Sequence, residues 1–211
     1  YGLSLQNLDT ESAPAKHART LTGHLNTFLA SMQAYYAGAL GVAYVNIMYA
    51  PYLEGMSYGE MKQEAQHLIF SCSQSAFSRG GQTLFLDFNV HTGIPRYLRN
   101  IPAVGPGGKP TGKTYGDYEE TARQFTLAML DVWREGDCHG HVFAFPKCDF
   151  HINEDTLSDP KQYEILEYAC QIASENGVHA ARLLDRATGG QEGVRMLHRP
   201  VADPAPRPDR A

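Results

Sequence analysis

One segment of the chain, Gly107–Thr114, matches the phosphate-binding pattern G-x-x-x-x-G-K-[ST]. In a working loop of this kind, backbone N–H groups cradle phosphates and the following helix adds the positive end of its dipole. Pro110 removes one of those N–H groups, and Tyr115-Gly116-Asp117 delays the helix that should begin at Lys113. This context favours a turn-rich connection, and a P-loop nucleotide-binding protein stays open as an alternative.

Histidines and cysteines between residues 138 and 151 are of the types that bind zinc. They are Cys138, His139, His141, Cys148 and His151. No Cys-x-x-Cys or His-x-x-x-His pair occurs among them, and alternation along a strand sends neighbouring side chains to opposite faces. We therefore expect no metal site in this chain.

A third segment, Ser78–Gln82, combines two glycines with polar side chains directly before an apolar run. The glycines allow close approach of the backbone, and Arg79 and Gln82 supply polar groups at the mouth of the predicted strand. By residue type alone, a ligand contact and a tight turn with a solvated Arg79 are equally good interpretations.

The elements that must position these segments are predicted from the spacing of apolar residues. Helices are expected over residues 15–37, 42–53, 58–77, 117–135 and 160–175, buried strands over 83–90 and 141–145, and a Gly/Pro loop over 101–116. Strands separated by helices indicate an α/β architecture.

Composition narrows the function classes. The 211 residues are 43% apolar and 19% charged, which excludes a disordered chain and predicts one domain or at most two. The net charge of −5 provides no electrostatic surface for nucleic acid or an anionic membrane, and no apolar run is long enough for a membrane span. Four cysteines are too few for a disulfide scaffold and indicate a reducing compartment, so we expect a cytoplasmic protein.

The last part of the chain differs from the rest in composition. Residues 178–211 contain no aromatic residue and no lysine, yet they contain six of the twelve arginines. One interpretation is a disordered Pro/Arg tail, and the other is a slip of the reading frame near Gly177. Read one base later, the codons of Met196-Leu197 give Cys-Cys if the leucine codon is CTG. The expected division is therefore 1–177, a folded domain, and 178–211, a disordered or out-of-frame tail that does not pack.

Several segments, in the same order, resemble the anaerobic (class III) ribonucleoside-triphosphate reductases, which are glycyl-radical enzymes. They are Ala13–His17, Gln33–Ala39, Tyr52-Leu53, Ser78–Thr83 with the strand that follows, Thr114–Tyr118 and Glu135–Pro146. Together they cover about residues 12–177. Many members of the family have Ile-Pro-Thr after the Phe-Pro pair, where this chain has Lys147-Cys148-Asp149.

The resemblance implies a fold and an activity. The fold would be about half of a ten-stranded α/β barrel with long surrounding helices. The activity would be the reduction of ribonucleoside triphosphates to deoxyribonucleotides by glycyl and thiyl radicals, with another glycyl-radical enzyme as the alternative. Full-length members use a glycyl radical, zinc and allosteric ATP or dNTP, form homodimers, and depend on a radical-SAM activase. This chain contains neither the radical-bearing segments nor the zinc cysteines, so we expect it to be an inactive fragment without catalytic residues.

The resemblance also suggests binding residues. It places Ser78–Gln82 at the start of a barrel strand, so we expect Arg79, Gly81 and Gln82 to lie close to the substrate. Arginine can pair with phosphate as a fork and glycine can expose N–H groups. Lys16, His17 and Gln33 are candidates for the allosteric nucleotide site. We expect the four cysteines to be structural.

Overall fold

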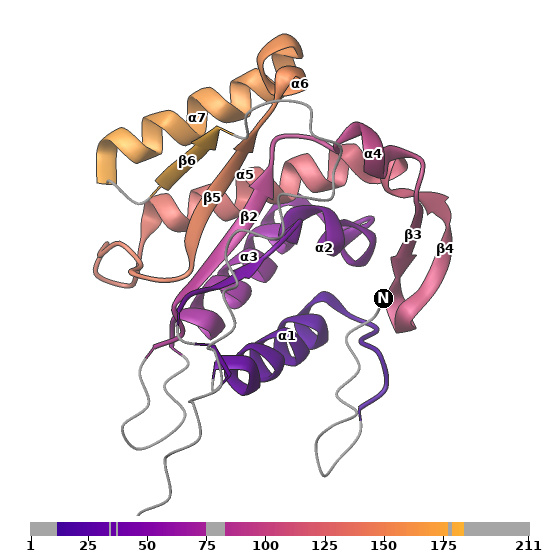
Figure 1. The fold of residues 1–211 in the computed structure, drawn as a ribbon, viewed down its shortest axis with the longest axis horizontal. Helices are drawn as coiled ribbons and strands as arrows, with labels where there is room; N and C mark the ends of the chain where they lie inside the picture. The colour runs from indigo at the N-terminus through magenta and orange to yellow at the C-terminus, as the bar shows by residue number, and fades with distance from the viewer. Residues whose placement is uncertain (1–11, 34, 37, 75–82, 177–178, 184–211) are drawn as a thin grey trace, which may run out of the picture.

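A four-stranded parallel sheet is the centre of the structure, a computed structural model that describes residues 12–33, 35–36, 38–74, 83–176 and 179–183 (Figure 1). The strands lie in the order β1-β2-β5-β6, and all neighbours are parallel. Their bounds are Leu40–Val42 (β1), Leu86–His91 (β2), Lys147–Ile152 (β5) and His179–Leu183 (β6). The α/β class with a parallel sheet is therefore confirmed.

Helices connect the strands of the sheet. They are α1 (Ala18–Gln33), α2 (Val45–Leu53), α3 (Tyr58–Ser73), α4 (Arg96–Arg99), α5 (Glu119–Glu135), α6 (Glu154–Ser158) and α7 (Pro160–Asn176). Between β2 and α5 the chain forms an antiparallel hairpin, β3 (Pro102–Gly105) and β4 (Lys109–Thr114), with short 3₁₀ turns η1 (Pro106–Gly108) and η2 (Tyr115–Tyr118). Among the described residues, none of the helices combines the length and apolar character that crossing a membrane requires.

The main core lies between one face of the sheet and the long helices. Alternate residues of β2 and β5 point to this face, where Phe88 lies beside Cys148 and Val90 beside Phe150. Helices α3 and α5 pack against each other behind these strands (Figure 1), and α7 packs against α5. Trp133 of α5 is fully buried against Phe88. Its indole Nε1 donates a hydrogen bond of 3.1 Å to the carbonyl of Pro146, which ties the helix to the start of β5.

Local sequence explains why the helices begin where they do. Ser57 caps α3 by accepting from the backbone N–H of Glu60, whose carboxylate accepts from the backbone N–H of Ser57 at 2.8 Å. This reciprocal pair satisfies two donors that a helix start would otherwise leave without partners. Thr114 and Asp117 form the same arrangement directly before α5.

Most helices expected from apolar periodicity are confirmed, and so is the buried strand before residue 91. The strand predicted over 141–145 is wrong, because pairing with β2 begins only at Lys147, opposite Asp87. The loop predicted over 101–116 is wrong as well, since this segment forms the β3-β4 hairpin. Strand β1 and helices α4 and α6 span three, four and five residues, too few for a periodic pattern.

Strand β6 lies beyond the boundary at residue 177 that composition suggested. Residues His179–Leu183 pair in parallel with β5 from Cys148 to Ile152. The expectation that the chain after residue 177 does not pack is therefore wrong for these five residues, while residues 184–211 lie outside the described part of the chain.

Replacing Trp133 tests how strongly the core depends on this side chain. We expect Trp133→Phe to lower the free energy of unfolding by about 2 kcal/mol, because the buried Pro146 carbonyl loses its donor. Trp133→Ala should lower it by roughly 4 kcal/mol, since a cavity remains as well. Urea denaturation followed by circular dichroism measures both, and exposed Tyr163→Phe is the control. Unchanged stability in both variants would contradict this account of the core.

Candidate functional site

The second face of the sheet carries polar side chains. They alternate with the core residues along β2 and β5. The register sets them side by side in pairs: Asp87 with Lys147, Asn89 with Asp149, and His91 with His151. A sheet with one apolar and one polar face has a side on which ligands can meet hydrogen-bonding groups.

Three aromatic rings form a stack at the carboxyl ends of the strands. Tyr44 follows β1 by two residues, His91 ends β2, and His151 lies one residue before the end of β5. The rings of Tyr44 and His91 are stacked with centroids 5.0 Å apart, and those of His91 and His151 at 4.5 Å. Parallel strands bring their carboxyl ends to one edge, the usual position of ligand sites in open α/β sheets.

Tyr44 adopts a strained backbone conformation at this edge. Its φ of 57° and ψ of 32° are left-handed, and it is the one non-glycine residue with positive φ in the described part of the chain. Such a conformation costs roughly 1–2 kcal/mol for a residue with a Cβ. The hydroxyl groups of Tyr44 and Tyr97 are hydrogen-bonded at 2.9 Å, which fixes the outer ring of the stack.

Asn46 holds the end of β2 in place. Its amide Nδ2 donates to the carbonyl of His91 at 2.9 Å and lies 2.8 Å from the Thr126 hydroxyl, while its Oδ1 accepts from the His91 N–H at 3.2 Å. Asn46 and Thr126 are fully buried. One side chain of α2 therefore links the strand end to α5.

The ring of His91 is enclosed and electrically neutral. It is 4% exposed, and neither ring nitrogen has a hydrogen-bond partner among the described residues. Burial, together with the nearby His151, lowers the pKa of His91 to about 3. At neutral pH the ring therefore presents one N–H donor and one acceptor nitrogen.

His151 is oriented by a neighbour on β2. Its Nε2 lies 2.5 Å from the amide Oδ1 of Asn89. An amide oxygen only accepts, so this nitrogen of His151 carries the proton.

The residues predicted next to the substrate are not among those that the structure describes. Arg79, Gly81 and Gln82 lie outside the described residues, which resume at Thr83, before β2. The six residues of β2 span about 20 Å. The ring stack therefore lies at the end of β2 that is far from Thr83.

The three candidates for the allosteric site are separated along α1. Lys16 and His17 are exposed and precede the helix, whereas Gln33 ends it and donates to the carbonyl of Thr83 at 3.5 Å. A helix of 16 residues is about 24 Å long. Within one chain, Lys16 and His17 therefore lie too far from Gln33 to contact the same nucleotide.

The segment that matches the phosphate-loop pattern has the wrong structure for that role. Gly107–Thr114 forms the end of η1 and strand β4, and a 3₁₀ turn separates it from α5. The ammonium group of Lys113 pairs with the carboxylate of Glu54. The nucleotide-loop alternative is therefore wrong.

The zinc-type residues do not converge. Within the described residues, no group of three or more His, Cys, Asp or Glu side chains is placed to hold a metal ion. Cys148 is buried on the core face, three residues before His151 on the polar face. Burial raises the pKa of Cys148 well above its usual range and that of Cys72 to about 12, so both thiols stay protonated.

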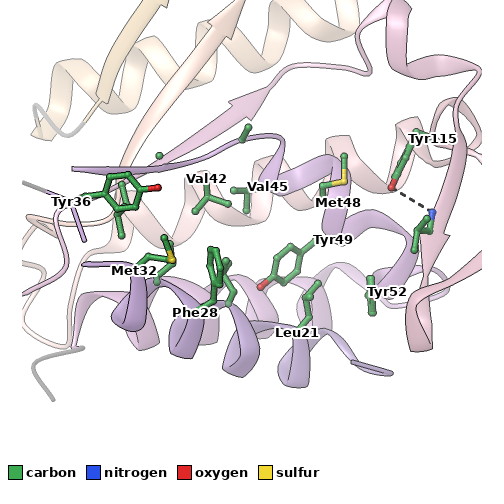
Figure 2. A pocket seen from close by; sticks show the side chains of 16 residues that line it. Leu21, Phe28, Met32, Tyr36, Val42, Val45, Met48, Tyr49, Tyr52 and Tyr115 are labelled. Carbon is green, nitrogen blue, oxygen red and sulfur yellow. Dashed lines mark hydrogen bonds between the residues drawn. The ribbon is translucent and has the colours of Figure 1, made fainter. Parts of the chain in front are cut away.

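A cavity of about 440 Å³ lies between α1, β1 and α2 (Figure 2). No lining side chain is charged. Leu21, Phe28 and Met32 project into it from α1, and Tyr49 and Tyr52 from α2. Two lining hydroxyl groups are already bonded, that of Tyr49 to Thr22 and that of Tyr52 to the Gly105 carbonyl. These groups do not provide a site for a triphosphate.

The fold is that of an α/β protein, and the polar residues at the carboxyl ends of its parallel strands form a candidate ligand site. Residues 1–196 match the family model described as anaerobic ribonucleoside-triphosphate reductase. The chain therefore belongs to that family, which confirms the resemblance. Curated proteins gave no match.

Solved structures agree at the level of the fold. An anaerobic ribonucleotide reductase is 18% identical with a TM-score of 0.65, and the match covers 86% of this chain and 29% of that one. The Thermotoga maritima enzyme with citrate in the active site is 19% identical with a TM-score of 0.65, covering 86% and 34%. The same enzyme in complex with dATP and CTP gives 19% and 0.63, covering 86% and 31%. This chain thus spans about a third of their length.

The neutral state of His91 predicts an acid-sensitive fold. The pKa of His91 is lowered in the folded chain, whereas the unfolded chain binds this proton below about pH 6.5. Stability should therefore fall as the pH drops from about 6.5 towards 3. His91 alone should cost about 2 kcal/mol between about pH 7 and pH 5.

Urea denaturation at several pH values measures this loss. His91→Phe should remove about 2 kcal/mol of the pH dependence, and His139→Phe, which changes an exposed ring, should keep it. An equal pH dependence in both variants would show that His91 is not the responsible group.

Proposed function

We propose that this chain is part of an anaerobic ribonucleoside-triphosphate reductase that converts ribonucleotides to deoxyribonucleotides by glycyl and thiyl radical chemistry. The observation that carries the proposal is the family match over residues 1–196. Because the chain spans about a third of its structural neighbours, the activity belongs to a longer protein. The fragment alone is proposed to be inactive.

We further propose that the sheet is about half of a ten-stranded barrel and that its polar face lines the interior. Helices cover the Phe88 face, while Asp87, Asn89 and His91 occupy the other. Strands β1 and β6 are the outer strands in the described part, where further strands can pair. Arg79, Gly81 and Gln82, which lie outside the described residues, are proposed to lie close to the substrate.

A homodimer with α1 at its interface is proposed for the longer protein. Small, exposed side chains follow one stripe of this helix: Thr20, Gly23, Thr27 and Ser31. Such a stripe lets a second helix approach closely. If two copies of α1 lie antiparallel, Lys16 and His17 of one copy come close to Gln33 of the partner subunit. This arrangement makes one effector site from residues that a single chain separates, and a dATP or ATP effector is proposed for it.

The radical and its activation are assigned to the longer protein. A glycyl radical installed by a radical-SAM activase supplies the hydrogen-atom chemistry. A zinc site is not assigned to this part of the chain, since Cys72 and Cys148 are buried at separate places in the core. A cytoplasmic location is proposed, in keeping with the free cysteines.

The activity is tested with the full-length protein encoded at the same locus. After anaerobic activation by its radical-SAM activase, it should convert CTP to dCTP and give the electron paramagnetic resonance signal of a glycyl radical. Protein without the activase is the control. A radical without deoxynucleotide formation would support another glycyl-radical enzyme instead.

The dimer is tested by enlarging one side chain on the exposed stripe of α1. Thr27→Arg should weaken self-association of the full-length protein at least about tenfold, because the long cationic side chain keeps the helices apart. Sedimentation velocity over a range of concentrations measures this change. Ser174→Arg, on the exposed surface of α7, is the matched control. If both variants associate equally, α1 does not lie at the dimer interface.

A further inference from the structure

We propose that His91 binds an uncharged hydroxyl-bearing group, such as the ribose of a nucleoside, through the edge of its ring at the carboxyl end of β2. The choice of a nucleoside rests on the proposed function. The role of His91 itself rests on the geometry of the ring stack.

The two stacked rings cover the faces of His91, so only the edge of its ring is left for a ligand to contact. Tyr44 covers one face of His91, and His151 covers the other, with interplanar angles of 14° and 23°. Both ring nitrogens lie on the edge between these faces, and neither has a partner among the described residues. A buried polar atom without a partner costs about 1–3 kcal/mol, so a ligand that bonds it recovers this energy.

The charge state of the ring selects the chemistry of the ligand. A neutral imidazole offers one donor and one acceptor, and a hydroxyl group can satisfy either. The lowered pKa of His91 means that an anion would first have to draw a proton into a buried ring. A hydroxyl group needs no such proton.

The charged groups around the stack also disfavour a phosphate. Asp149 lies beside Asn89 on the same face, one pair away from the histidines, and Asp87 lies further along β2. Lys147 is opposite Asp87, about 13 Å along the strand from His151.

The arginines that follow β2 are already paired. Arg96 forms an ion pair with Asp155 at 2.5 Å, and Arg99 with Glu119 at 2.7 Å. Little positive charge is therefore left at this edge for a phosphate group.

The surroundings hold His91 in one position. Asn46 bonds both the N–H and the carbonyl of His91, and the hydroxyl groups of Tyr44 and Tyr97 are joined. Strained backbone at Tyr44 is retained where it completes the stack, and such strain concentrates at functional sites. A fixed ring can bind a hydroxyl group with little loss of side-chain entropy.

The test follows the ring nitrogens of the histidines in the 211-residue chain by NMR while cytidine is added. Cytidine should shift the ring signals of His91. The same titration with 2′,3′-dideoxycytidine, which lacks the 2′- and 3′-hydroxyl groups of the ribose, and with inorganic tripolyphosphate should leave the His91 signals in place. His91→Phe keeps an aromatic ring in the stack but removes both nitrogens, and it should weaken cytidine binding roughly tenfold. His139→Phe is the control for a lost exposed histidine.

Each other outcome overturns the assignment. Equal binding of cytidine and dideoxycytidine would remove the hydroxyl contact, and His91 signals that move only with tripolyphosphate would identify an anion site. If no probe binds, or if His91→Phe binds cytidine as the wild type does, His91 is not a binding residue. The measurement on the wild-type chain stands even if the variant fails to fold. None of these results affects CTP reduction by the full-length protein, which tests the proposed function separately.

Discussion

The side chain of Asn46 is the interaction on which the candidate site depends. It bonds both backbone groups of His91 and contacts the hydroxyl of Thr126, so α2, β2 and α5 meet at one amide. The backbone N–H and carbonyl groups at the end of a strand need hydrogen-bond partners, and here the side chain of Asn46 is the partner of both. Because these bonds are made away from water, losing any of them would leave a buried polar group without a partner. The position of the ring stack therefore follows from the packing of α2 against α5.

One face of the sheet packs into the apolar core, and the other carries the polar side chains that form the candidate site. The face of Phe88 and Phe150 is closed by α3 and α5 and contains the fully buried Trp133. The other face carries the polar side chains of Asn89 and His91 on β2 and of Asp149 and His151 on β5. A strained Tyr44 and a buried neutral histidine both cost free energy, and the core face offsets them.

Much of the fold could be predicted from local sequence, but the site could not. Apolar spacing indicates the long helices, and the run before residue 91 indicates β2, because both signals are contained in one segment. The ring stack joins Tyr44, His91 and His151, which are 47 and 60 residues apart in sequence, so no motif contains it. One signal was present: a histidine follows directly after the predicted strand, and ligand sites occur at the carboxyl ends of parallel strands. To connect this histidine with Tyr44 and His151, one would need the order of the strands in the sheet, which the composition and spacing of residues do not give.

The structure explains how Lys147-Cys148-Asp149, which depart from the family pattern after Pro146, fit into the fold. Lys147, Cys148 and Asp149 begin β5, so their side chains alternate between the faces. Cys148 enters the core beside Phe88 as a small apolar side chain, and its raised pKa keeps it protonated. Lys147 and Asp149 fall on the polar face, where they pair in register with Asp87 and Asn89. The three residues thus keep one apolar and one polar face on the sheet, and Lys147 and Asp149 place one positive and one negative charge on the polar face.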